Sequence, residues 1–156
     1  MPLLSPSDQD QLRAEFAKMT RSVRLLFFTQ TIGCETCPQT RQILDELPPL
    51  SDRIAIEEVN LVLDKERAAQ FGVDRAPAVA VAYEDGAGDE NAASTRLLND
   101  SRIRFWGTPA GYEFISLVQA VLLVGGARES TLSDASQAAL AAVDRPVTLH
   151  VFTTPT

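Results

Sequence analysis

The pair of cysteines constrains this chain more than any other feature of its sequence. Cys34 and Cys37 are its only two cysteines, and Glu35 and Thr36 separate them. An apolar run of strand length, residues 23–29, precedes the pair, and a helical pattern follows it. A disulfide between two cysteines so close in sequence closes too small a loop to stabilise a fold much. Chemical reactivity or metal binding therefore explains the pair better.

The position of the pair favours redox chemistry. The free N–H groups and the positive dipole end at a helix N-terminus stabilise an anion, which lowers the pKa of a cysteine placed there. Cys34 could then attack a disulfide, and Cys37 could resolve the mixed disulfide. Zinc needs four ligands, and His150 is the only other obvious candidate. A zinc or iron–sulfur site bridging two chains, or an inert pair, remain alternatives.

The remaining pattern predicts a mixed sheet between helices. Helices are expected over 7–20, 35–47, 65–71 and 109–124, with Ser5 or Ser7 capping the first, Asp64 the third and Thr108 the last. Strands are expected over 23–29, 54–62, 78–83 and 102–106. This order, with a βαβ crossover followed by a helix, a hairpin and a final helix, predicts an α/β fold. Its central mixed four-stranded sheet has helices on both faces.

Charge and hydropathy exclude several classes of function. The chain has 14 basic and 21 acidic residues, a net charge of −7, which disfavours binding to nucleic acid or anionic membranes. No signal-peptide pattern is found, and the most apolar stretch, 114–124, is too short to span a bilayer. We therefore expect a cytoplasmic protein. The acidic stretch 84–91 lacks calcium-loop spacing and is predicted to be a solvated loop.

The C-terminal tail repeats the beginning of the chain. Residues 133–143 resemble the first predicted helix, and Leu149, Val151 and Phe152 match Leu25, Phe27 and Phe28 at a constant offset of 124 residues. This self-similarity predicts that residues 1–126 form one unit and that 127–156 hold a linker helix and the first strand, 147–153, of a truncated second unit. The partner of Cys34 would fall just beyond Thr156. The alternative is that any helix followed by an apolar strand looks alike.

Three separated motifs resemble a known family. The stretches FFTQTIGCETC, DRAPAVAV and RFWGTPAGYEF look like the first unit of the glutaredoxin-like protein disulfide oxidoreductases, which contain two tandem thioredoxin folds. The N-terminal domain of alkyl hydroperoxide reductase flavoprotein subunits is related and also double. The resemblance covers about residues 7–126, and VTLHVFTTPT resembles the opening of the second unit.

The resemblance implies a thioredoxin-like fold and roles for particular residues. Cys34 would be the nucleophile and Cys37 the resolving thiol. Pro77 would be a cis-proline, and the backbone of Ala76 before it would pair with a substrate peptide; the alternative is a trans-proline at an edge strand. Gly107 matches the family's turn glycine. His150 is expected to pack in a core or at a sheet edge, and Trp106 over the end of the sheet.

Two departures from the family pattern bear on redox direction. The strand before the cysteines, 25–28, is apolar, whereas many thioredoxins bury an acid there. Glu35 should raise the pKa of Cys34. Both departures favour a donor of electrons over a strong oxidant.

We therefore predict a thiol–disulfide oxidoreductase that acts on protein substrates without a bound cofactor and takes electrons from a separate reductase. The alternative is a non-catalytic docking module or half of a homodimer that needs the missing second unit.

Overall fold

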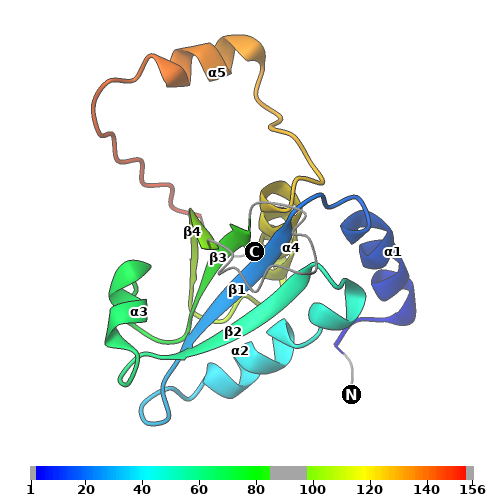
Figure 1. Cartoon of the computed structure of the whole chain (residues 1–156), viewed down its shortest axis with the longest axis vertical. Coiled ribbons are helices and arrows are strands. Elements are labelled where there is room, and N and C mark those ends of the chain that lie inside the picture. The colour runs from blue at the N-terminus through cyan, green and yellow to red at the C-terminus, as the bar shows by residue number, and fades with distance from the viewer. Residues whose placement is uncertain (1–2, 85–97, 154–156) are drawn as a thin grey trace, which may run out of the picture.

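The computed structural model describes residues 3–84 and 98–153 (Figure 1). The expected loop over 84–91 therefore lies, beyond Glu84, outside the described residues. The elements, in chain order, are α1 (Pro6–Phe16), β1 (Ser22–Thr29), α2 (Cys37–Leu44), the short 3-10 helix η1 (Pro48–Leu50), β2 (Ile54–Asn60), α3 (Lys65–Gln70), β3 (Ala78–Glu84), β4 (Leu98–Trp106), α4 (Tyr112–Val124) and α5 (Asp134–Ala141).

The four strands form one mixed sheet in the order β2-β1-β3-β4. β1 runs parallel to β2 and antiparallel to β3, and β3 runs antiparallel to β4. The parallel pair is joined by α2, as a βαβ crossover requires. The predicted mixed four-stranded sheet is confirmed, although β2 ends at Asn60, where the Asn60 side chain accepts the N–H groups of Val62 and Leu63 in a turn.

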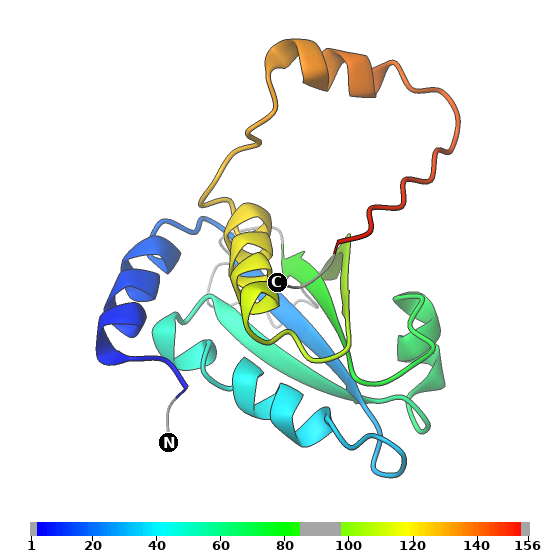
Figure 2. The same ribbon diagram turned by 180° about the vertical axis from the view of Figure 1, so that it is seen from behind.

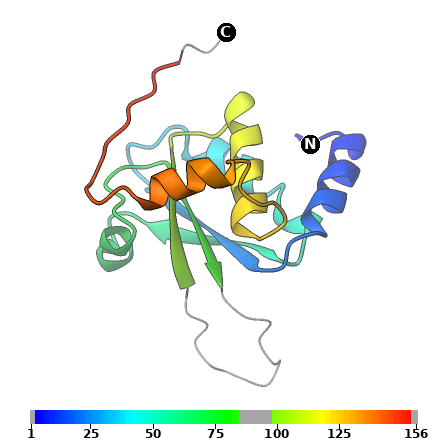
Figure 3. The ribbon, with the colours of Figure 1, turned by 90° about the horizontal axis from the view of Figure 1, so that it is seen from above.

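β1 is buried on both faces because a core covered by helices lies on each side of the sheet. Leu25 and Phe27 face a core that α2 and α4 cover, whereas Leu26 and Phe28 face a smaller core beneath α3. Viewed from above, α3 stands on one side of the sheet and α2 and α4 on the other (Figure 3). Helices therefore cover both faces, as predicted.

The N-terminal helix α1 ends four residues earlier than expected. Ser5 caps it, because its hydroxyl accepts the N–H of Asp8 while the Asp8 carboxylate accepts the N–H of Ser5. The helix ends at Phe16 instead of Thr20 because the N–H groups of Thr20 and Arg21 donate to the Gly125 carbonyl, 2.8 and 3.0 Å away. That contact with the end of α4 turns the chain into β1.

Two further helix boundaries differ from the sequence prediction. α2 covers 37–44 instead of 35–47, and the prolines that follow form η1 instead of simply ending the helix. α4 begins at Tyr112 instead of Pro109, with Gly111 at its N-cap. Neither Thr108 nor Asp64 caps a helix with its side chain: Asp64 accepts the Asn60 N–H, and Thr108 bonds to α2.

The tail leaves the folded body after α4. The expected linker helix is present as α5, with Ser133 at its N-cap, but all its residues are exposed. The expected strand 147–153 is not formed: these residues lie in no helix or strand, and Phe152 is 90% exposed. Figures 1 and 2 show α5 standing away from the sheet. None of the helices among the described residues is long and apolar enough to cross a membrane.

Candidate active site

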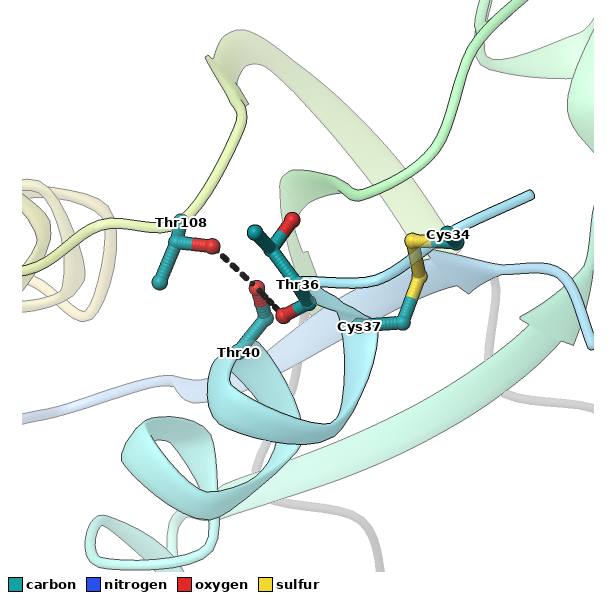
Figure 4. Close-up of a disulfide and its surroundings, with 5 residues drawn as sticks. All are labelled: Cys34, Thr36, Cys37, Thr40 and Thr108. Atoms are coloured by element: carbon teal, nitrogen blue, oxygen red, sulfur yellow. Dashed lines mark hydrogen bonds between the residues drawn. A yellow bond between two sulfur atoms is a disulfide. The ribbon is translucent and has the colours of Figure 1, made fainter.

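The two cysteines lie at the connection between β1 and α2. A loop over 30–36 connects the two elements, with Gly33 in the left-handed conformation at φ 79°, a backbone region that favours glycine. Cys37 is the first residue of α2, and Cys34 stands three residues before it. Their sulfur atoms are joined in a disulfide with the Cα atoms 5.4 Å apart (Figure 4). The pair thus occupies the helix N-terminus that the sequence predicted.

The two cysteines differ in exposure. Cys37 is only 5% exposed and belongs to the main core, whereas Cys34 is partly exposed and packs against the edge of that core. An incoming disulfide can therefore reach the Cys34 sulfur more readily than the Cys37 sulfur. This order of exposure fits the roles that the resemblance implies, with Cys34 as the nucleophile and Cys37 as the resolving thiol.

The Ala76–Pro77 peptide bond is cis, as predicted. Pro77 immediately precedes β3, and its carbonyl accepts the N–H of Gly107, 2.9 Å away, in the turn after β4. Ala76 and Cys34 pack against the same core cluster as Cys37. Phe28, near the end of β1, stands opposite Ala78, the first residue of β3, so the loop before β3 and the loop that holds the disulfide lie at the same end of the sheet.

Thr40 was not singled out by the sequence analysis as part of the site. It is completely buried one turn into α2, and its hydroxyl donates to the Thr36 carbonyl at 3.0 Å. The Thr108 hydroxyl lies 2.8 Å from the same Thr40 oxygen (Figure 4). A threonine on the same helix face as Cys37 and Leu44 was the available signal. Its partner across 68 residues could not be read from the sequence.

Exposed side chains surround the disulfide end of the sheet. Trp106 stands opposite Ala78 in the sheet register and is 43% exposed, and the Arg75 guanidinium lies 5.0 Å from the centre of its ring. Arg75 also bonds to Asp74 at 3.0 Å, and this hydrogen bond lowers the pKa of the Asp74 carboxyl. Ile32, in the loop before Cys34, is highly exposed.

Ion pairs link Arg24, near the start of β1, to both neighbouring strands. Arg24 of β1 pairs with Glu57 of β2 at 3.3 Å and with Glu84 of β3, and Arg67 also binds Glu57. Burial raises the pKa of Glu57, but its bonds to Arg67 and then Arg24 outweigh that effect and hold the pKa below the ordinary value. Residues 25–28 of β1 are apolar and fully buried, as the sequence predicted.

The described residues of this single chain hold no ready-made cluster of metal ligands. They contain no group of three or more histidine, cysteine or acidic side chains that could hold a metal ion. His150 is exposed in the tail, with its ring 6.2 Å from the Phe152 ring, so the expectation that it packs in a core or at a sheet edge was wrong. Residues 127–153 form no strand, so His150 does not belong to a sheet.

Two solved structures resemble this chain over most of its length. One is the NTD_N/C domain of alkylhydroperoxide reductase AhpF from Enterococcus faecalis, with 28% identity and a TM-score of 0.73, covering 91% of this chain and 62% of that one. The other is a protein disulfide oxidoreductase from Aeropyrum pernix, with 26% identity and a TM-score of 0.68, covering 88% of this chain and 54% of that one.

Two curated proteins, both described as probable thioredoxins, match part of the sequence. The one from Methanothermobacter thermautotrophicus is 31% identical over 49 residues, which are 31% of this chain and 58% of that protein. The one from Methanothermobacter marburgensis is 30% identical over 60 residues, 38% of this chain and 69% of that protein. This chain thus spans under two thirds of the first protein and of the AhpF structure. No family model matches the chain.

Proposed function

The chain belongs to the thioredoxin family, and from this premise we propose that it is a thiol–disulfide oxidoreductase that exchanges disulfides with protein substrates. Its thioredoxin-like fold supports the proposal. The observation that carries it is the Cys34–Cys37 disulfide, which joins a partly exposed cysteine to a buried one at the start of α2.

The proposed reaction uses both cysteines in turn. In the reduced protein the Cys34 thiolate attacks one sulfur of the substrate disulfide, which releases one substrate thiolate and leaves a mixed disulfide. The Cys37 thiol then loses its proton and attacks the Cys34 sulfur, which releases the second substrate thiolate. Two electrons pass to the substrate, both released thiolates take up protons, and the Cys34–Cys37 disulfide remains. A separate reductase of unknown identity would reduce it again.

The loop before β3 is the proposed substrate-binding element. The backbone of Ala76, next to the cis bond to Pro77, would pair with an extended segment of the substrate. Its position supports this role, because Phe28, near the end of β1 that leads to Cys34, stands opposite Ala78, the residue after Pro77. Backbone pairing is independent of side-chain identity and suits an enzyme that accepts protein disulfides.

The tail supports a second, smaller proposal about domain organisation. We infer that residues 1–126 form one thioredoxin-like unit and that 127–156 begin a second. The AhpF structure matches 91% of the chain, a share larger than residues 1–126 could supply, so its likeness includes part of the tail. The exposed side chains of Leu149, Val151 and Phe152 would then belong to a core that this second unit completes. A homodimer stays a prediction, which sedimentation would test.

Reduction of insulin by dithiothreitol tests the proposed activity. The full chain should accelerate the appearance of turbidity from reduced insulin, and Cys34→Ser should abolish that acceleration. Cys37→Ser should trap a mixed disulfide with the substrate through Cys34. A folded protein that does not accelerate the reaction would favour the non-catalytic docking module instead.

Iodoacetamide labelling tests the roles of the two cysteines. The reagent should label Cys34 before Cys37 in the reduced protein.

A further inference from the structure

The buried threonine in α2 has a hydrogen-bond pattern that packing alone does not require. Thr40 is 0% exposed, and apolar side chains would fill such a site as well. Its hydroxyl donates to the Thr36 carbonyl, which also accepts the Thr40 N–H at 2.9 Å. Because the single hydroxyl proton is used there, the Thr108 hydroxyl is the donor in the 2.8 Å contact between the two side chains. Thr108 therefore bonds directly to the helix of the cysteines.

The same contact leads onward to the loop that holds the cis-proline. Thr108 follows Gly107, and the Gly107 N–H donates to the Pro77 carbonyl at 2.9 Å. Three segments that are distant in sequence are thus tied together by two hydrogen bonds and one peptide link. These segments are the first turn of α2, the turn between β4 and α4, and the loop before β3. Figure 4 shows Thr108 reaching from the turn after β4 toward Thr40.

We propose that the hydrogen bond between the Thr40 and Thr108 hydroxyls fixes the position of α2, which carries the cysteines, relative to the loop before β3, which would bind the substrate. The inference rests on the proposed function, because it concerns where a bound protein segment lies relative to Cys34. Neither threonine is a catalytic residue. Each acts through main-chain groups. Thr40 holds the carbonyl of Thr36, and Thr108 follows Gly107, whose N–H is hydrogen-bonded to the Pro77 carbonyl.

Geometry explains why such a pair affects the rate. Disulfide exchange needs the attacking thiolate close to, and aligned with, the sulfur under attack, and small errors in position are costly. A protein substrate held by the Ala76 backbone has its sulfur placed by the loop, whereas α2 places Cys34. Any movement of the loop relative to α2 therefore displaces the substrate sulfur from the Cys34 sulfur. A small disulfide that binds no backbone can align itself, so it escapes this cost.

The test compares a protein disulfide with a small one. We expect Thr40→Val and Thr108→Val to lower kcat/KM for insulin reduction by about tenfold. The rate at which the reduced protein reacts with the small aromatic disulfide DTNB should stay within about twofold of wild type. Thr40→Ser, which keeps the hydroxyl, should restore most of the insulin activity. Thr20→Val, before β1, is the matched control and should change neither rate.

A double variant and a stability check complete the design. Because either substitution breaks the same link, Thr40→Val with Thr108→Val should lose no more insulin activity than one substitution alone. Thermal melts must show that every variant is folded at the assay temperature. If Thr40→Val is not folded, Thr108→Val tests the proposal alone, because Thr108 is only half-buried.

The outcomes separate this inference from the proposed function. Inactive wild-type protein would refute the oxidoreductase proposal itself. An active wild type whose valine variants keep full insulin activity would overturn the positioning role. Equal losses of rate with insulin and with DTNB would also overturn it, because the hydroxyl pair would then affect the Cys34 thiolate itself and not the position of the loop relative to α2.

Discussion

Two regions of the molecule carry the same sequence pattern and have different structures. In the first, α1 leads into β1; in the second, α5 leads into residues 147–153, which match β1 at an offset of 124 residues. Both helices begin at a serine whose hydroxyl accepts a backbone N–H at 3.2 Å, from Asp8 for Ser5 and from Ser136 for Ser133. The helix is therefore reproduced in both places.

The strand is formed in only one of them. β1 pairs with β2 on one side and β3 on the other, and its Phe28 is fully buried. The matching Phe152 is 90% exposed, and residues 147–153 form no strand. A helix satisfies its hydrogen bonds within itself, whereas a strand needs neighbours. The comparison teaches that the repeated pattern specifies a helix locally but leaves the strand to its surroundings.

Hydrogen exchange should show the largest difference between the two regions. The amides of residues 23–28 should exchange only through global unfolding, which typically costs about 5–15 kcal/mol, whereas those of 147–152 should exchange almost without protection. The measurement is native-state exchange of the full chain by NMR at dilute concentration. Strong protection of 147–152 in a demonstrably monomeric sample would contradict the structural difference.

Truncating the matched phenylalanines should give the next largest effect. Phe28→Ala should lower the free energy of unfolding by about 3–5 kcal/mol, because it opens a cavity in the core beneath α3. Phe152→Ala, its matched control, should change it by less than about 0.5 kcal/mol, because the ring is exposed. Urea denaturation of both variants checks the pair, and equal losses would show that the tail packs on the first unit in solution.

Removing the two caps should separate global from local stability. Ser5→Ala should lower the free energy of unfolding by about 1 kcal/mol, because it removes the hydroxyl that accepts the Asp8 N–H and donates to the Asp8 carboxylate, and α1 packs on the core through Phe16. Ser133→Ala should leave that free energy unchanged and reduce only the helicity of α5, which buries no residue. Urea denaturation measures the first effect and chemical shifts along α5 measure the second. A global loss from Ser133→Ala would mean that α5 contributes to the core.

The smallest expected effect concerns the ion pairs that only β1 can make. Thr148 stands where β1 has Arg24, so the tail lacks the bonds to Glu57 and Glu84. Because the folded protein lowers the pKa of Glu57, its contribution is present above the unfolded value of about 4.3 and is lost as pH falls through the lower folded value.

Solvent screening keeps that contribution to about 1 kcal/mol or less. Urea denaturation of wild type and Glu57→Gln across this range should show wild type more stable near pH 7, with the difference shrinking as the pH falls below about 4. A difference that grew toward low pH would contradict the lowered pKa.

The sequence predicted much of the fold and part of the site. The strand run, the C-x-x-C motif and the position of Pro77 led to the sheet, the disulfide location and the cis bond, because each depends on a short stretch with a distinctive residue pattern. The ends of α1 and α4 were misplaced. Contacts with distant residues set both: Gly125 binds the chain after α1, and Thr40 engages the Thr108 hydroxyl that was expected to cap α4.

By itself, the sequence determined features that a few neighbouring residues can satisfy. Two serine-capped helices, a left-handed glycine before the cysteines, and an apolar run at β1 all follow from local hydrogen bonding, backbone freedom and hydrophobicity. Tertiary structure decided which of two matching apolar runs became a strand and which hydroxyl met Thr40. Both outcomes depend on partners from distant parts of the chain, because the hydrogen bonds of a strand and of a buried hydroxyl must be made by groups that only the assembled fold brings near.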